Sequence, residues 1–199
     1  MNSSVQSIPV FNLLISFVPV AIVLAIMIAW SQKVWQAIYA LGRMVLQLVL
    51  IGYLLVFIFE TRYSGVVLIV LTVMLLAAGW ISLNPVAARR RVLLLPVLVS
   101  LFVGCGLTLA VLTQGVLRLE PWFLPQYMIP LAGMTLANAM TSVSLSAERY
   151  ETEIVRGAEP GEARHIAMTT GMIPVVNALF AVGLVALPGM MTGQILPGV

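Results

Sequence analysis

Six long apolar stretches constrain the fold of this chain more than any other feature of its sequence. They lie near residues 9–30, 36–59, 64–83, 92–113, 126–146 and 168–188. A helix needs about 20 residues to cross a hydrocarbon core of about 30 Å, and each stretch is long enough to do so. The sequence therefore predicts an all-α polytopic membrane protein with about six transmembrane helices.

The overall composition agrees with a membrane protein and with a single domain. Hydrophobic residues make up 61% of the chain and charged residues 9%, whereas soluble domains are roughly a quarter charged. No linker, low-complexity tract or repeat divides the sequence, so we expect residues 1–199 to form one transmembrane domain. The net charge of +3 is scattered without a basic stripe, so nucleic acid is not an expected partner.

The residue types that the chain lacks argue against an enzyme. It has no Asp, one lysine (Lys33) and one histidine (His165). A phosphate-binding P-loop needs a glycine-rich stretch before its lysine, a Ser-His-Asp triad needs an Asp, and an H-E-x-x-H zinc site needs two histidines. We therefore expect no catalytic residue and no cofactor on this chain. Any ATP that drives it would be hydrolysed on another subunit.

Arginine and lysine are distributed unevenly between the expected loops. The loop after the first apolar stretch holds Lys33, the loop after the third holds Arg89, Arg90 and Arg91, and the loop after the fifth holds Arg149, Arg156 and Arg164. The alternate loops hold only Arg62 and Arg118. Short cytoplasmic loops are enriched in these residues. The pattern predicts an extracytoplasmic N terminus, and it makes the segment around residues 147–167 the largest cytoplasmic feature.

The segment "AERYETEIVRGAEPGEARH" (147–165) holds eight of the seventeen charged side chains. Residues 148–156 read as a polar continuation of the fifth helix. Gly157 suits a left-handed C-terminal cap, and Pro160 suits the first turn of a new helix. We therefore predict a helix, a sharp turn and a second helix. The alternative is an ordinary solvated loop.

This segment resembles the coupling loop of ABC importer-type permeases, in which a short helix docks into an ATP-binding subunit. The shared pattern is "GA-x-P-x-x-A", and Glu159 stands where the pattern usually has Ser or Thr at the helix N-cap. The resemblance implies a coupling role for the residues of this turn: Arg156, Gly157, Ala158, Glu159, Pro160 and Ala163.

Three longer motifs resemble the FetB-type permease family. They are "LGRMVLQLVLIGY" (41–53), "QYMIPLAGMTLANAM" (126–140) and "VGLVALPGMMTGQI" (182–195). Bacterial members of that family are assigned to metal export, especially of iron, and plant relatives are linked to aluminium tolerance. The resemblance implies the membrane subunit of an ABC transporter in a bacterial inner membrane. It further implies a permease homodimer, two ATP-binding partners that hold ATP and Mg, and about one further membrane helix in the family.

Several uncharged polar or small residues in the apolar stretches have two interpretations each. A pathway or gate could include Asn138, Thr141, Asn177, Pro188 and Gly189, or these residues could serve helix packing. Arg43 and Gln47 could lock their helix to a neighbour, or Arg43 could snorkel to the headgroups. Gly133 would permit close helix approach.

No metal site can be assigned from the sequence. Iron normally takes imidazole or carboxylate ligands, which the apolar stretches lack. The absence of acidic residues from these stretches also argues against a proton-coupled carrier. A secondary carrier or channel without an ATPase, and a membrane scaffold that transports nothing, remain the alternatives to an ABC permease.

Overall fold

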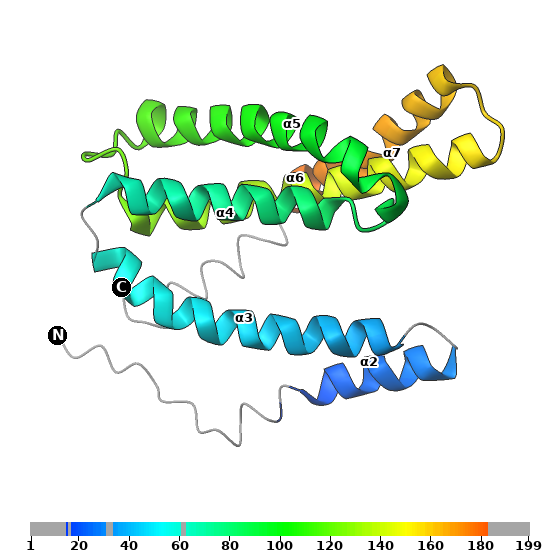
Figure 1. Cartoon of the computed structure of the whole chain (residues 1–199), viewed down its shortest axis with the longest axis horizontal. Coiled ribbons are helices and arrows are strands. Elements are labelled where there is room, and N and C mark those ends of the chain that lie inside the picture. Colours follow the sequence, from blue (N-terminus) through cyan, green and yellow to red (C-terminus); the bar gives the residue numbers. More distant parts are fainter. Residues whose placement is uncertain (1–14, 16, 31–33, 61–62, 183–199) are drawn as a thin grey trace. The chain divides into compact units, whose positions relative to one another are not determined.

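The computed structural model describes residues 15, 17–30, 34–60 and 63–182. Every regular element in this part of the chain is helical, which confirms the predicted all-α class (Figure 1). In chain order the elements are α2 (Val18–Ala29), α3 (Val34–Glu60), α4 (Ser64–Ser82), the 3-10 turn η1 (Ala87–Arg89), α5 (Arg90–Ala110), the π-helical turn η2 (Val111–Val116), α6 (Pro125–Val155) and α7 (Pro160–Ala181).

In the part of the chain that the structure describes, four helical segments are long and apolar enough to cross a membrane. They are Val34–Tyr53, Ser64–Ser82, Ala87–Val116 and Pro125–Val155, and they coincide with the second to fifth apolar stretches. The apolar helix α2 has 12 residues, whereas the predicted first span begins at residue 9, outside the described residues. The predicted sixth span also extends past residue 182. The first and sixth spans therefore stay predictions.

The chain separates into two compact units. Among the described residues, one unit holds α2 and α3 up to residue 57, and the other, within residues 58–187, holds the rest. In the first unit, α2 is apolar on every side, and a proline in its first turn fits the helix N-terminus. Helix α3 has 27 residues. The second unit holds α4 to α7 and carries the charged segment.

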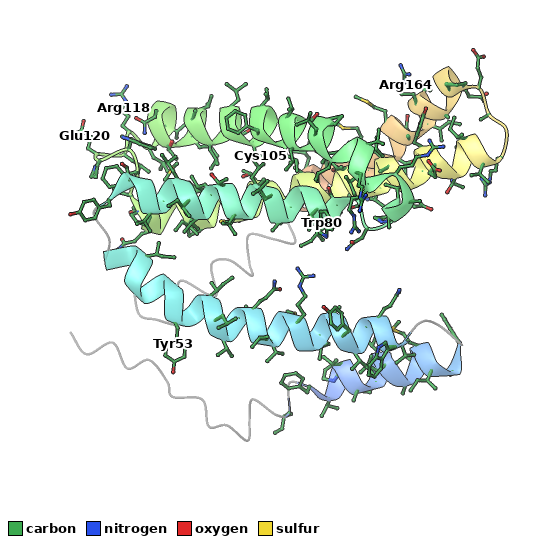
Figure 2. All side chains as sticks on the ribbon, viewed as in Figure 1. Tyr53, Trp80, Cys105, Arg118, Glu120 and Arg164 are labelled. Carbon is green, nitrogen blue, oxygen red and sulfur yellow. The ribbon has the colours of Figure 1, made fainter. Side chains whose placement is uncertain are left out.

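A core at the contact of α4, α5 and α6 organises the second unit. Its buried members are Ala78, Leu101, Cys105 and Leu136. Gly79 of α4 lets α5 approach closely, since a Cβ atom at this position would lie 3.2 Å from Cγ of Leu98. Figure 2 labels Cys105 on the α5 side of the core. The small side chains of Ala78 and Cys105, together with Gly79, allow the close helix packing that is typical of membrane bundles.

Helix α7 returns along α6 on a stripe of small residues. Ala163, Ala167 and Gly171 recur at intervals of four residues, and all three are buried. A Cβ atom on Gly171 would clash with Oγ of Ser146 and lie 3.1 Å from the carbonyl oxygen of Ser142. The two helices are therefore packed against each other backbone to backbone at Gly171.

Candidate functional site

The predicted turn between residues 148 and 160 is present in the structure. Helix α6 ends at Val155, and Gly157 adopts a φ of +90°. The Gly157 N–H donates to the carbonyl of Ile154 over 3.1 Å, and the Ala158 N–H donates to the carbonyl of Glu153 over 3.0 Å. These two bonds form a Schellman motif, which satisfies carbonyl groups left free at the end of a helix. Pro160 then begins α7, so the helix–turn–helix prediction is confirmed.

Glu159 occupies the N-cap position of α7 without capping it through its side chain. Its backbone is extended, with φ −62° and ψ 143°, and its carbonyl accepts the Ala163 N–H over 2.9 Å. An exposed carboxylate at a helix N-terminus still gains from the helix dipole. Ala163, the last residue of the motif, is fully buried where α7 meets α6. Gly157, Pro160 and Ala163 of the motif therefore each have a structural role in the turn or at the start of α7.

Glu153 is a buried carboxylate just before the turn, and the sequence analysis did not single it out. Arg149 Nη2 lies 2.8 Å and Arg156 Nη1 lies 3.2 Å from its Oε1. Spacings of four and three residues bring these side chains to one face of a helix, and this signal was available in the sequence. Of the predicted coupling residues, Arg156 thus helps to fix the last turn of α6. We call residues 148–163 the α6–α7 hairpin.

A third ion pair ties this hairpin to the α4–α5 turn. Arg89 Nη1 lies 3.4 Å from Oε2 of Glu151. The α4–α5 turn and the α6–α7 hairpin therefore lie at the same end of the helices, as the alternating charge pattern predicts. Figure 2 shows Arg118 at the opposite end of this unit from Arg164. Within this unit, the positions of the arginines agree with the alternating charge pattern of the sequence. The orientation of the unit in the membrane stays a prediction.

The structure brings together two of the proposed pathway residues. Asn138 and Thr141 of α6 line a cavity of about 230 Å³ with Pro174 and other residues of α7. The Thr141 hydroxyl donates to the carbonyl of Ala137 over 3.0 Å, so it is engaged with its own helix. Asn177 lies on α7 beside a different cavity. Pro188 and Gly189 lie outside the described residues.

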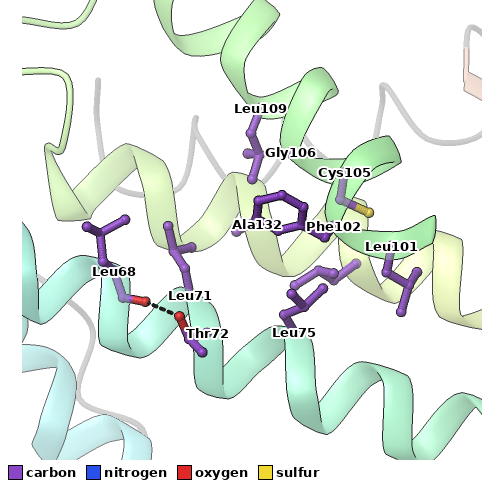
Figure 3. Close-up of a pocket in the computed structure, with 11 residues that line it drawn as sticks. Leu68, Leu71, Thr72, Leu75, Leu101, Phe102, Cys105, Gly106, Leu109 and Ala132 are labelled. Carbon is purple, nitrogen blue, oxygen red and sulfur yellow. Dashed lines mark hydrogen bonds between the residues drawn. The ribbon is translucent and has the colours of Figure 1, made fainter. Parts of the chain in front are cut away.

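A further cavity of about 160 Å³ lies between α4, α5 and α6 (Figure 3). Its walls are apolar apart from Thr72 and Cys105, and the Thr72 hydroxyl donates to the carbonyl of Leu68 over 2.8 Å. Such a space offers an ion such as iron one hydroxyl oxygen and one thiol, without a carboxylate or an imidazole. Within residues that the structure describes, no group of three or more His, Cys, Asp or Glu side chains could hold a metal.

The three residues predicted to pack helices have different surroundings. Gly133 of α6 is half-buried and faces α4, since a Cβ atom there would lie 3.5 Å from Cε of Met74. This contact agrees with the packing interpretation. Arg43 and Gln47 are exposed on α3, and the proposed lock between α3 and a neighbouring helix stays a prediction.

Long apolar helices, closely packed helix contacts and a charged hairpin at one end define a polytopic helical membrane protein. The chain belongs to the uncharacterised protein family UPF0014, which matches residues 10–199. This membership confirms the resemblance to FetB-type permeases, because that family includes the relatives described next.

Three curated relatives show how far the similarity extends. The chain is 37% identical over 178 residues to a UPF0014 membrane protein of Synechocystis, covering 82% of this chain and 69% of the relative. It is 32% identical over 200 residues to the probable iron export permease protein FetB of Escherichia coli, covering 89% and 74%. It is also 32% identical to the protein ALUMINUM SENSITIVE 3 of Arabidopsis thaliana, covering 90% and 71%. No solved structure matches the chain.

Proposed function

We propose that this chain is the membrane-spanning permease subunit of an ABC transporter that exports a metal ion such as iron. In this proposal a separate subunit binds ATP and Mg and hydrolyses the ATP, and two permease chains assemble in a bacterial inner membrane. The observation that carries the proposal is similarity over 89% of the chain to a protein named as a probable iron export permease.

The α6–α7 hairpin supports the part of the proposal that concerns an ATP-binding partner. Residues 148–155 continue α6 by about two polar turns, which is about 12 Å at 1.5 Å per residue. The Schellman motif and the buried Glu153 hold the tip in one conformation. A rigid, charged hairpin that extends beyond the apolar part of its helices can dock into another protein with little loss of conformational entropy.

The polar lining of the cavity beside Asn138 supports the part of the proposal in which the ion passes through transient contacts. Its polar lining groups are an amide and hydroxyls, without a carboxylate or an imidazole. Hard cations bind neutral oxygen groups of this kind. Because such a set has no charge, it would release the ion readily, as conduction requires.

Co-purification with an ATP-binding subunit, followed by metal analysis of cells that lack the pair, tests the proposed function. We expect a stable complex whose ATPase activity depends on the permease, and iron retention in cells without it. Metal transport that persists in reconstituted membranes without ATP would instead indicate a secondary carrier or channel. Unchanged metal content after deletion would indicate a scaffold.

Replacing Gly157 tests the coupling role of the hairpin. Gly157→Val forces a β-branched residue into the left-handed region, which costs about 1–2 kcal/mol or more. The matched control is Gly161→Val, because a Cβ atom at either position meets no atom within 4 Å, while only Gly157 has a positive φ. We expect Gly157→Val to reduce ATPase stimulation severalfold and Gly161→Val to leave it nearly unchanged. Normal stimulation in a well-folded Gly157→Val protein would contradict the assignment.

A further inference from the structure

A groove of about 430 Å³ lies between the α4–α5 turn and helices α5, α6 and α7, inside the unit of residues 58–187. The charged and phenolic side chains in its lining are Arg89, Tyr150, Glu151 and Arg164. The rest of the lining is almost wholly apolar and includes Leu93, Val97, Met168 and Met172. This amphiphilic groove differs from the cavity beside Asn138, which lies between α6 and α7 farther from the α6–α7 hairpin.

The charges of the groove leave one positive charge without a partner. Arg89 and Glu151 pair over 3.4 Å and neutralise each other. Arg164 is exposed, and in the described part of the chain no carboxylate lies within ion-pair distance of its guanidinium. A guanidinium is well suited to bind a phosphate by paired hydrogen bonds. The charge of the groove therefore matches a ligand with a single negative charge.

The polar end of the groove lies at the level expected of lipid headgroups. Arg90, the neighbour of Arg89 in the chain, places its guanidinium 4.5 Å from the ring centroid of Trp80. Tryptophan and arginine side chains are typical of the membrane–water interface. Figure 2 shows Trp80 toward the same end of the unit as Arg164.

The apolar part of the groove lies at the depth expected of acyl chains when the arginines are at the level of the headgroups. Met172 follows Arg164 by eight residues on α7, which is about 12 Å at 1.5 Å per residue. Val97 follows Arg89 by the same number of residues along η1 and α5. The arginines and the apolar walls are thus arranged in the order in which a phospholipid presents its headgroup and its chains.

We infer that this groove binds an anionic glycerophospholipid. Its phosphate lies at Arg164, the arginine of the groove that has no carboxylate partner among the described residues, and one acyl chain lies along Met168 and Met172. A hydrophilic ion or chelate does not suit the apolar walls, because burying a charged group against apolar side chains costs desolvation free energy. An apolar acyl chain has no such cost. The site is independent of the proposed export function, because it needs neither an ATP-binding partner nor a transported metal.

Native mass spectrometry of the full-length protein in a neutral detergent tests the lipid site. With phosphatidylglycerol and phosphatidylcholine supplied at equal concentration, we expect preferential binding of phosphatidylglycerol. Arg164→Gln should reduce that preference about fivefold, since one arginine near a membrane surface contributes about that factor for an anionic lipid. Arg118→Gln is the matched control, because Arg118 is an exposed arginine at the other end of the unit. Equal binding of the two lipids, or equal effects of the two substitutions, would overturn the inference.

A cross-linking experiment identifies what occupies the apolar part. Met168→Cys in a Cys105→Ala background provides a thiol at an exposed position of the groove, and a photoreactive maleimide is attached to that thiol. We expect adducts with phosphatidylglycerol in membranes. Adducts confined to protein, whether another helix of the same chain, a second copy or an ATP-binding subunit, would show that the groove is a protein contact and would overturn the lipid assignment.

Discussion

Individual residues determine how closely the helices of the second unit approach one another. Gly171 shows this most clearly, because it lies against the backbone of Ser142 and the side chain of Ser146. From sequence, the small residues of the fifth and sixth apolar stretches could be assigned to packing in general. The sequence could not show which residue faces which helix, since that depends on the angle at which α7 returns after the turn.

Gly171→Ala should lower the thermal unfolding midpoint of the purified protein. The added methyl group must push α6 and α7 apart, and overpacking typically costs about 1–3 kcal/mol, more than the gain of up to about 1 kcal/mol in helix propensity. The control is Gly104→Ala on α5, where a Cβ atom meets nothing within 4 Å. This control should be neutral or stabilising. A midpoint that rises equally in both variants would show that the close contact at Gly171 is not important for stability.

Helices and turns were predictable to different degrees from the sequence. The long apolar runs predicted four helices that are long and apolar enough to cross a membrane, and the Gly157 and Pro160 signals predicted the hairpin, because both depend on local chemistry. The π-helical turn at Val111–Val116 has no comparable local signal. The Arg89–Glu151 pair joins residues 62 positions apart, and no periodicity in the chain predicts a contact of that kind.

The Arg89–Glu151 pair should transmit movement between the α6–α7 hairpin and the α4–α5 turn if the hairpin docks an ATPase. Both side chains are partly exposed, so the pair contributes only about 0–1 kcal/mol to stability and can break and re-form. Arg89→Glu and Glu151→Arg alone should each reduce ATPase stimulation in the complex, because each places like charges together. The double exchange should restore it. Failure of the double exchange, with the unfolding midpoint unchanged, would exclude a role for this pair in coupling.

At the scale of the whole molecule, the distribution of arginine makes one prediction about orientation. The structure places the loops of residues 89–91 and 147–165 at one end of the second unit and Arg118 at the other. Because positive loops are retained in the cytoplasm, the end with the α6–α7 hairpin should be cytoplasmic. An ATP-binding subunit could reach the hairpin only in that orientation, so topology decides whether the proposed function is possible.

Cysteine labelling of intact cells measures this orientation directly. In a Cys105→Ala background, Val155→Cys and Val116→Cys place thiols at exposed positions near the two ends of the second unit; the native side chains are 79% and 67% exposed. A membrane-impermeant maleimide should label position 116 from outside the cell and position 155 only after permeabilisation. Labelling in the reverse order would place the hairpin outside the cytoplasm, where no ATPase could dock. That result would refute the ABC permease proposal, while the lipid groove would then lie in the opposite leaflet with its chemistry unchanged.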